Sequence, residues 1–481
     1  SLPAPLPDDI NTLKALVAEH VARADRLQAE KAAADQHIVR LDAKVLSLQE
    51  QLNLALARRY AASSEKLSPD QIRLFDEAEA DAAMGVEDDA QDEAIAVPAH
   101  TRKRRGRRPL PENLPRVEVI HAMPADQRLC PHDGQVLAEI NQVVSEQLDI
   151  IPAQIRVIRH IRKQYACACG QCIRTAPLPG QPIPKSMASP GLLAHIAVCK
   201  YQDALPLYRQ EQILQRIGVD IPRATLANWM IRAGQLVQPL INLLRDRLLA
   251  YDIVQMDETT VQVLKEPGKT AQSKSYLWLQ RGGPPDEPVI LFDYDPTRCQ
   301  AVPKALLEGF AGYLQADGYS GYNGVVAEGG LVQVGCMAHA RRKFSEAVKG
   351  QGKHPRQGKA HQGLAWIQRL YRIEKQARTQ QLSPQARQLH RQQHAAPVLA
   401  KLRAWLDASL PGVPPGTLTG KALNYLNNEW PKLVRYLEDG RLEIDNNLAE
   451  NAIRPFVIGR KNWLFSDSVH GVKASANLYS L

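Results

Sequence analysis

The chain has little of what secreted and membrane proteins need. Its 481 residues include only seven cysteines, most of them in one stretch, which is unlike the framework of a disulfide-stapled secreted domain. No apolar run approaches the roughly 20 residues that cross a bilayer, and the polar, proline-rich start is not a signal peptide. We therefore expect a cytoplasmic protein without a membrane partner.

The chain also has fewer acidic than basic residues. The formal net charge is +9 and the pI is about 9.1, which favours a polyanionic partner such as nucleic acid. Hydrophobic residues make up 44% of the chain, enough to build cores, and the length predicts several domains.

Proline and glycine are missing from residues 10–57, where apolar side chains recur at alternating steps of four and three. This spacing predicts a leucine-zipper coiled coil over residues 8–60 that joins two or more copies of the chain. A long helix packed on its own protein is the alternative. The seam positions are Leu13, Val17, His20, Ala24, Leu27, Lys31, Ala34, Ile38, Leu41, Val45, Leu48, Leu52 and Ala55.

Residues 61–114 combine an acidic linker with a basic arm. The acidic part, residues 76–93, has the composition of a disordered segment. The arm that follows is of a kind that enters a narrow minor groove of DNA, where the potential is most negative. Its cations are Arg102, Lys103, Arg104, Arg105, Arg107 and Arg108.

Residues 115–182 hold two cysteine turns joined by strand-like sequence, a pattern typical of a zinc ribbon. The first turn has a single cysteine, Cys130, and Asp133 stands where a second is usual. His132 or Asp133 could complete a tetrahedral Zn²⁺ site with Cys130 and the second turn. That turn offers Cys167 and either Cys169 or Cys172.

Residues 183–250 are predicted to be helical and to bind DNA. A helix near residues 207–214, a glycine turn at 217–219 and a second helix opened by Pro222 form a helix-turn-helix pattern. Arg223 and Asn228 lie near the exposed start of that second helix and are the candidate DNA contacts. Leu226 and Trp229 are expected in the core.

Residues 251–475 are predicted to form an α/β catalytic core of the ribonuclease-H-like kind. Three consecutive strands are expected at 252–264, 275–281 and 288–294, then a helix near 301–309, a strand ending at Asp317 and another near 331–334. A helical insert at about 344–436 interrupts this core.

Three acidic residues in this region suggest a metal-dependent nuclease. Asp257 and Asp317 each end a short apolar run, and Glu450 lies at a capped helix start. Neighbouring strands would bring the aspartates together and the later helix would supply Glu450. Such carboxylates suit Mg²⁺ or Mn²⁺, hard cations that prefer oxygen ligands. Glu258 is expected on the opposite sheet face because strand side chains alternate.

The chain resembles the insertion-sequence sixty-six family of DDE-type bacterial transposases over nearly its whole length. The resemblance is carried most specifically by residues 315–323, 336–344, 444–447 and 459–465. It implies a Mg²⁺-dependent transposase that hydrolyses DNA at the ends of an element and then transfers the freed 3′-hydroxyl, by a cut-and-paste or a replicative route. It also implies a short segment after Leu481.

The roles of the site residues follow from charge and geometry. Asp257, Asp317 and Glu450 would be the catalytic metal ligands, and His339 would touch the scissile phosphate, orient a carboxylate or serve as a buried structural histidine. Arg454, Arg460 and Lys461 would grip flanking phosphates. The partners would be terminal repeats, target DNA, further copies of the chain and accessory proteins of the same element, at the bacterial nucleoid.

Two other readings remain at this point. The chain would be a DNA-binding regulator if its nuclease core were inactive, which the three acids argue against. A coiled-coil scaffold would explain only the first sixty residues.

Overall fold

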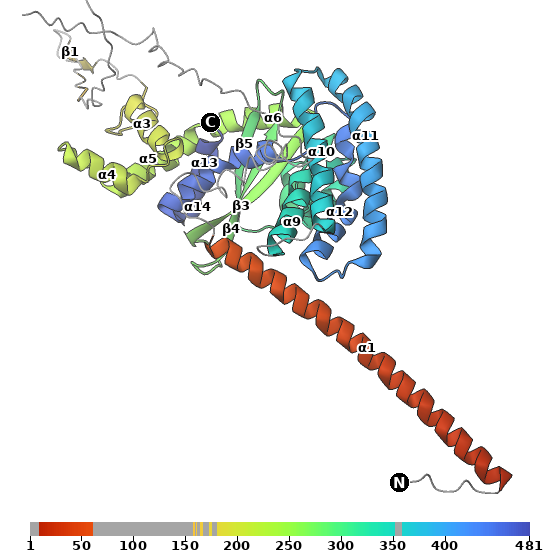
Figure 1. Cartoon of the computed structure of the whole chain (residues 1–481). Helices are drawn as coiled ribbons and strands as arrows, with labels where there is room; N and C mark the ends of the chain where they lie inside the picture. The colour runs from red at the N-terminus through yellow and green to blue at the C-terminus, as the bar shows by residue number, and fades with distance from the viewer. Residues whose placement is uncertain are drawn as a thin grey trace, which may run out of the picture. The chain divides into compact units, whose positions relative to one another are not determined.

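The computed structural model describes residues 9–60, 157–158, 160, 164–166, 173–175, 180–351 and 358–481 (Figure 1). The chain divides into two compact units. One combines Ser1–Asp89 with Gly180–Leu481, and the other is Ala90–Pro179. Within the described residues, none of the helices offers a stretch long and apolar enough to cross a membrane.

A mixed β-sheet forms the centre of the larger unit. Strands β3 (Ile253–Lys265), β4 (Lys274–Gly282) and β5 (Val289–Asp295) are antiparallel neighbours, as the sequence predicts. Strands β6 (Tyr313–Gln315) and β7 (Val332–Val334) run parallel to β3, which gives the order β5-β4-β3-β6-β7. A short strand, β8 (Ser466–Ser468), pairs with the far end of β3.

Glycine at position 312 permits the pairing of β3 with β6. Its φ is +142°, and a Cβ there would lie 2.4 Å from the carbonyl oxygen of Asp252. The close approach lets the Tyr313 amide donate to that same carbonyl at 2.9 Å, which sets the register of the two strands.

Side-chain alternation along β3 divides the core between two faces. Val254 and Met256 pack toward α6 (Gln238–Leu249), α7 (Ala301–Leu306) and α8 (Asn323–Gly329). Val261 and Val263 pack on the other face, toward α13 (Asn447–Trp463) and α14 (Val469–Tyr479). A short 3₁₀ turn, Ser320–Tyr322, precedes α8.

The insert predicted at about 344–436 is helical. It contains α9 (Met337–Gly350), α10 (Lys359–Thr379), α11 (Pro384–Ser409) and α12 (Leu418–Leu433), with 3₁₀ turns at Leu410–Gly412 and Arg435–Leu437. These helices pack on one another around a core that also includes Ile253 of β3 and Val334 of β7 (Figure 1). The ends of the insert lie close together, because the Gly335 amide donates to the Lys432 carbonyl at 3.0 Å.

The region before the sheet is helical as expected. It comprises α3 (Pro190–Tyr201), α4 (Leu207–Arg216) and α5 (Arg223–Leu236). Gly218, with a φ of +83°, lies in the turn between α4 and α5. Leu226 and Trp229 are buried, which confirms their predicted place in the core.

Helix α1 (Ile10–Tyr60) is a single helix of 51 residues. Its carboxyl-terminal part docks through the face opposite the heptad seam. Glu50 accepts a hydrogen bond from the Leu418 amide at 2.8 Å, Asn53 donates to the Gly350 carbonyl at 3.1 Å, and Leu54 is buried. From Val17 onward the seam leucines and valines stay exposed, and 56% of the Leu48 surface is accessible. The helix is confirmed, and the coiled coil stays a prediction that this exposed seam supports.

We expect residues 10–57 to associate on their own and to dissociate when Leu41 and Leu48 are both replaced by Asp. Carboxylates on a buried seam would cost several kcal/mol of desolvation. Sedimentation equilibrium of the two peptides measures the change. The matched control places Asp at Ala29 and Gln36, on the outer face of the same helix. An unsubstituted peptide that stays monomeric at high concentration would contradict the coiled-coil prediction.

The smaller unit contributes one described hairpin. Strand β1 (Gln164–Ala166) pairs antiparallel with β2 (Ile173–Thr175). In sequence, the second cysteine turn connects these two strands. The proposed zinc ligands Cys130, His132, Cys167, Cys169 and Cys172 lie outside the described residues, as does the basic arm at 102–108.

Candidate active site

The two aspartates meet because β3 and β6 are parallel and in register. Gln255 is the partner of Gln315, so Asp257 follows two residues later within β3 and Asp317 follows two residues beyond the end of β6. The two glutamines are buried and share a hydrogen bond of 3.0 Å between Nε2 of Gln255 and Oε1 of Gln315. Asp257 ends its short apolar run but not its strand. Pairing with β4 carries β3 on to Lys265.

Glu450 reaches the aspartates from the first turn of α13. Asn446, the residue that precedes this helix, does not cap it with its side chain. Its Nδ2 instead donates to the Met256 carbonyl at 2.8 Å, which anchors the start of α13 beside Asp257. Burial raises the pKa of Asp257 well above its usual value, and the nearby charges of Glu450, Glu258 and Asp317 raise it further.

His339 lies in the first turn of α9 and completes this cluster. Its Nδ1 is 3.8 Å from Oε1 of Glu450, and a guanidinium nitrogen of Arg342 is 3.7 Å from the other carboxylate oxygen. Burial lowers the pKa of His339 to about 4, helped by Arg342 and Lys343 and opposed by Asp317. The imidazole is therefore neutral at physiological pH and can donate one hydrogen bond and accept another.

The cluster fits a divalent cation. Buried carboxyl groups that lie close together raise one another's pKa. A bound dication stabilises their ionised forms. Beyond the effect of burial, the charges of Glu450, Glu258 and Asp317 also act to raise the pKa of Asp257. All three groups are carboxylates, the donors that Mg²⁺ and Mn²⁺ prefer.

Glu258 points away from this cluster, as predicted. One of its oxygens accepts from Nε of Arg298 at 2.7 Å, and the other accepts from the Tyr322 hydroxyl at 2.7 Å. The Arg298 guanidinium stacks 3.9 Å from the centre of the Tyr319 ring. Sequence reasoning missed Arg298, because its place beside Glu258 depends on the path of the loop after β5.

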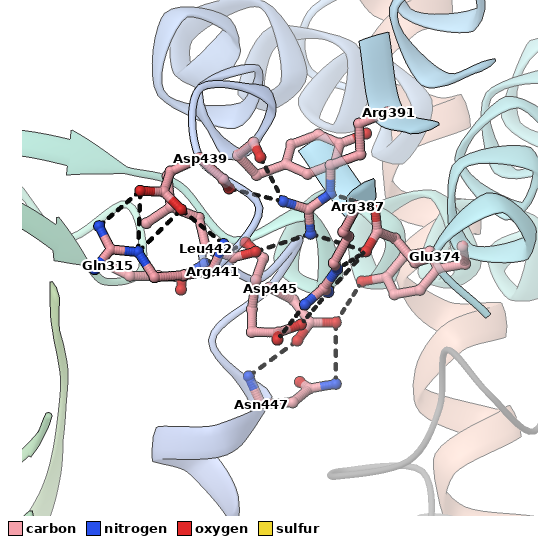
Figure 2. Close-up of polar contacts among 12 residues, drawn as sticks. Gln315, Glu374, Arg387, Arg391, Asp439, Arg441, Leu442, Asp445 and Asn447 are labelled. Carbon is pink, nitrogen blue, oxygen red and sulfur yellow. Dashed lines mark hydrogen bonds and ion pairs between the residues drawn. The ribbon is translucent and has the colours of Figure 1, made fainter. Parts of the chain in front are cut away.

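The insert supports the loop that precedes α13 through a buried arginine (Figure 2). Arg391 of α11 is fully buried and binds both carboxylate oxygens of Glu374 at 2.8 and 2.9 Å. The same guanidinium donates to three carbonyl groups of the loop at 2.7, 2.9 and 2.8 Å, those of Tyr436, Asp439 and Leu442. Helix α11 therefore fixes the course of the loop that precedes α13.

A second arginine extends this network to the sheet. Arg387 donates to Glu374 at 2.8 Å and to both oxygens of Glu443 at 3.0 and 2.8 Å. The Glu443 carbonyl accepts from Nε2 of Gln315 at 2.7 Å, next to Asp317. Figure 2 places Arg387 between Glu374 and the segment around Asp445. The α10–α11 pair is thus linked to the strand that presents the second aspartate.

Asp445 gives this loop a measurable pH response. Burial raises its pKa to about 6, against the opposing hydrogen bonds from Tyr371, at 2.8 Å, and Asn447. The unfolded value is near 3.8, so the folded protein holds the proton between the two values. The free energy of unfolding should therefore fall as pH rises from about 4 to about 6, and then level off.

Replacing Asp445 by Asn should remove that slope, because an amide stays neutral and still accepts from Tyr371. The stability difference between variant and parent should grow by about 2–3 kcal/mol over the window, the size of a two-unit pKa shift. Denaturant unfolding at pH 4, 5, 6 and 7 measures it. If the stability difference between variant and parent does not change with pH, the raised pKa of Asp445 is contradicted.

The predicted DNA contacts on α5 and α13 range from exposed to half-buried. Arg223 and Asn228 are exposed on α5, and Lys461 is exposed on α13. Arg454 is half-buried on α13. The guanidinium of Arg460 is held by β3, where it donates to the hydroxyls of Thr259 and Thr260 at 3.1 and 3.2 Å.

Comparison with known families adds an independent finding. A profile described as "Transposase IS66 family" matches residues 185–474. A second, "Transposase C of IS166 homeodomain", matches residues 47–119. A third, "zinc-finger binding domain of transposase IS66", matches residues 127–170, a range that includes Cys130, His132, Cys167 and Cys169 but ends before Cys172.

Two relatives from Sinorhizobium fredii are similar over most of their length. The protein y4jD is 35% identical over 390 residues, which cover 77% of this chain and 73% of the relative. The protein y4qI is 32% identical over an alignment of 505 residues, and this alignment covers 99% of this chain and 91% of the relative. Both are described as uncharacterized proteins.

Proposed function

Since the chain belongs to the IS66 transposase family, we propose that it binds the ends of an insertion sequence and catalyses metal-dependent DNA strand cleavage and strand transfer. The observation that carries the proposal is the meeting of three acids from distant segments. Asp257 lies in β3 and Asp317 just beyond the parallel strand β6, and Glu450 comes close to Asp257 from α13.

The sheet supports a ribonuclease-H-like core of the DDE kind. Three antiparallel strands are followed by two strands parallel to the first, and the first and fourth strands in sequence present the two aspartates. The third acid comes from a helix on the face opposite α6 and α7. Fold alone does not set function, so the argument rests on the acids themselves.

The chemistry divides between the cations and the chain. Bound Mg²⁺ or Mn²⁺ would lower the pKa of the attacking water or 3′-hydroxyl and stabilise the leaving oxyanion. Asp257, Asp317 and Glu450 would hold it. His339, neutral and beside Glu450, would donate a hydrogen bond to a phosphate oxygen or keep that carboxylate in place.

DNA contacts would come from several segments. The arm at 102–108 would neutralise phosphates, and the exposed start of α5 with Arg223 and Asn228 would read the element ends. Arg454 and Lys461 on α13 would contact phosphates near the cut, whereas Arg460 would first have to leave Thr259 and Thr260. Zinc in the module at 127–170, self-association through α1 and accessory proteins of the element would complete the assembly at the bacterial nucleoid.

Cleavage of DNA that carries the cognate element ends tests the proposal. With Mg²⁺ the full chain should nick at the element boundary and leave a 3′-hydroxyl, and EDTA should abolish the reaction. DNA of the same length with scrambled ends is the matched control. End-specific binding without cleavage in Mg²⁺ or Mn²⁺ would instead indicate a DNA-binding regulator.

A further inference from the structure

The first turn of α9 places a sulfur and an imidazole beside Glu450. Cys336 precedes α9 and His339 lies three residues later, so both side chains occupy the same end of the helix. One ligand atom from each of Cys336, His339 and Glu450 lies within 4.8 Å of the others. Cys336 is 1% exposed and Glu450 is 8% exposed, so this is an interior cluster.

The donor atoms of this cluster are only partly used by the protein. The Cys336 sulfur accepts a hydrogen bond from the backbone amide of Asn446 at 3.2 Å. Within the described part of the chain, Nδ1 of His339 is buried and makes no hydrogen bond. Such a buried nitrogen carries a desolvation cost that a ligand at its lone pair would offset.

The two oxygens of Glu450 face different neighbours. Oε1 lies toward His339 at 3.8 Å, and Oε2 lies toward Arg342 at 3.7 Å. The cationic guanidinium opposes a bound cation, but it stands beside the oxygen that points away from the imidazole. A metal ion between Oε1, the imidazole and the sulfur would leave the ion pair with Arg342 in place.

We propose that Cys336, His339 and Glu450 form a site for a borderline-soft cation, Zn²⁺ or Co²⁺, which shares Glu450 with the Mg²⁺ cluster. One sulfur, one nitrogen and one oxygen make a donor set that Zn²⁺ accepts readily, with water in the fourth position, and that Mg²⁺ does not favour. Binding releases the thiol proton, because the thiolate is the ligand. The site is distinct from the zinc module at 127–170.

A regulatory consequence follows, and it rests on the proposed function. Glu450 held by Zn²⁺ together with Cys336 and His339 is withdrawn from Mg²⁺. Zn²⁺ binds nitrogen and sulfur donors far more tightly than Mg²⁺ does, so a low concentration of Zn²⁺ should inhibit cleavage.

Cobalt binding to the full chain tests the site without any need for activity. Metal-free protein is titrated with Co²⁺, and the near-ultraviolet thiolate-to-cobalt absorption is followed. Cys336→Ser should bind one equivalent of Co²⁺ fewer than the parent, and its thiolate-to-cobalt absorption should be correspondingly weaker. Cys299→Ser, which changes an exposed free cysteine elsewhere, should match the parent. The zinc module contributes equally to all three proteins and cancels in the difference.

His339→Gln provides a second route if Cys336→Ser fails to fold, and circular dichroism establishes which variants are folded. This variant should weaken the same equivalent by about tenfold or more, the scale on which changes at metal sites act. If each folded variant binds as many equivalents as the parent with the same affinity, the site is overturned.

Inhibition tests the sharing of Glu450. In a cleavage assay at fixed Mg²⁺, Zn²⁺ should inhibit the parent at a concentration about tenfold or more below that needed for Cys336→Ser. If Zn²⁺ inhibits the parent and Cys336→Ser at the same concentration, the proposal that the two metal sites share Glu450 is overturned. A chain that binds the extra cobalt but cuts no DNA would refute the proposed function and uphold the site.

Discussion

Replacing Glu450 by Gln is expected to lower the rate of DNA cleavage by on the order of 10³-fold or more, while DNA affinity changes little. A metal ion contributes several kcal/mol to the transition state, and each 1.36 kcal/mol is about tenfold in rate. The amide keeps the shape of the side chain but removes the charge that holds the cation. Asp257→Asn and Asp317→Asn should act alike. Single-turnover cleavage and fluorescence anisotropy measure rate and binding.

Asp467→Asn is the matched control. Asp467 is an exposed carboxylate that pairs with Lys265 at 2.8 Å at the far end of β3, so its loss should leave cleavage unchanged. Near-normal cleavage by the Glu450 variant would mean that the third ligand is a different acid. Glu443 and Asp445, in the loop before α13, would then be the candidates.

Deleting residues 102–108 is expected to reduce the slope of log affinity against log salt by up to about 5. The arm carries six cations, and each phosphate neutralised contributes about 0.9 to that slope. At low salt the shortened chain should bind all DNA sequences more weakly. Its preference for element ends should survive, because we assign that preference to α5. Binding measured between 50 and 200 mM salt gives the slope.

An arm in which every arginine becomes lysine is the control, since it keeps the charge and should keep the slope. An unchanged slope after deletion would mean that the arm does not contact DNA. Loss of end preference with nonspecific binding intact would move sequence reading from Arg223 and Asn228 to the arm.

The pattern of the sequence was enough to predict the sheet and the meeting of the acids. Short apolar runs predicted β3, β4 and β5 within a residue or two, because strands buried on both faces need apolar side chains at successive positions. The aspartates came together because parallel neighbours in register must present equivalent positions at one level. Glu450 could be placed only by its helix start and by the family resemblance.

The support around the acids could not be predicted. Arg391 reads as an ordinary surface cation of a polar helix, yet it is buried against Glu374 and three loop carbonyls. Its partners lie 17 to 51 positions away in sequence, and no local periodicity encodes them. Arg460 was expected to face DNA for the same reason, because the nearness of Thr259 and Thr260 depends on how α13 crosses β3.

The distance in sequence between the acids also sets the order in which the protein acquires its abilities during synthesis. The arm and helices α3–α5 leave the ribosome before the sheet does. Glu450 follows Asp317 by roughly 130 residues, which at about 5–20 residues per second takes on the order of ten seconds. Tyr479, which packs against Tyr201, Phe292 and Phe456, arrives later still. If the proposed function holds, a nascent chain would therefore hold DNA before it is able to cut it.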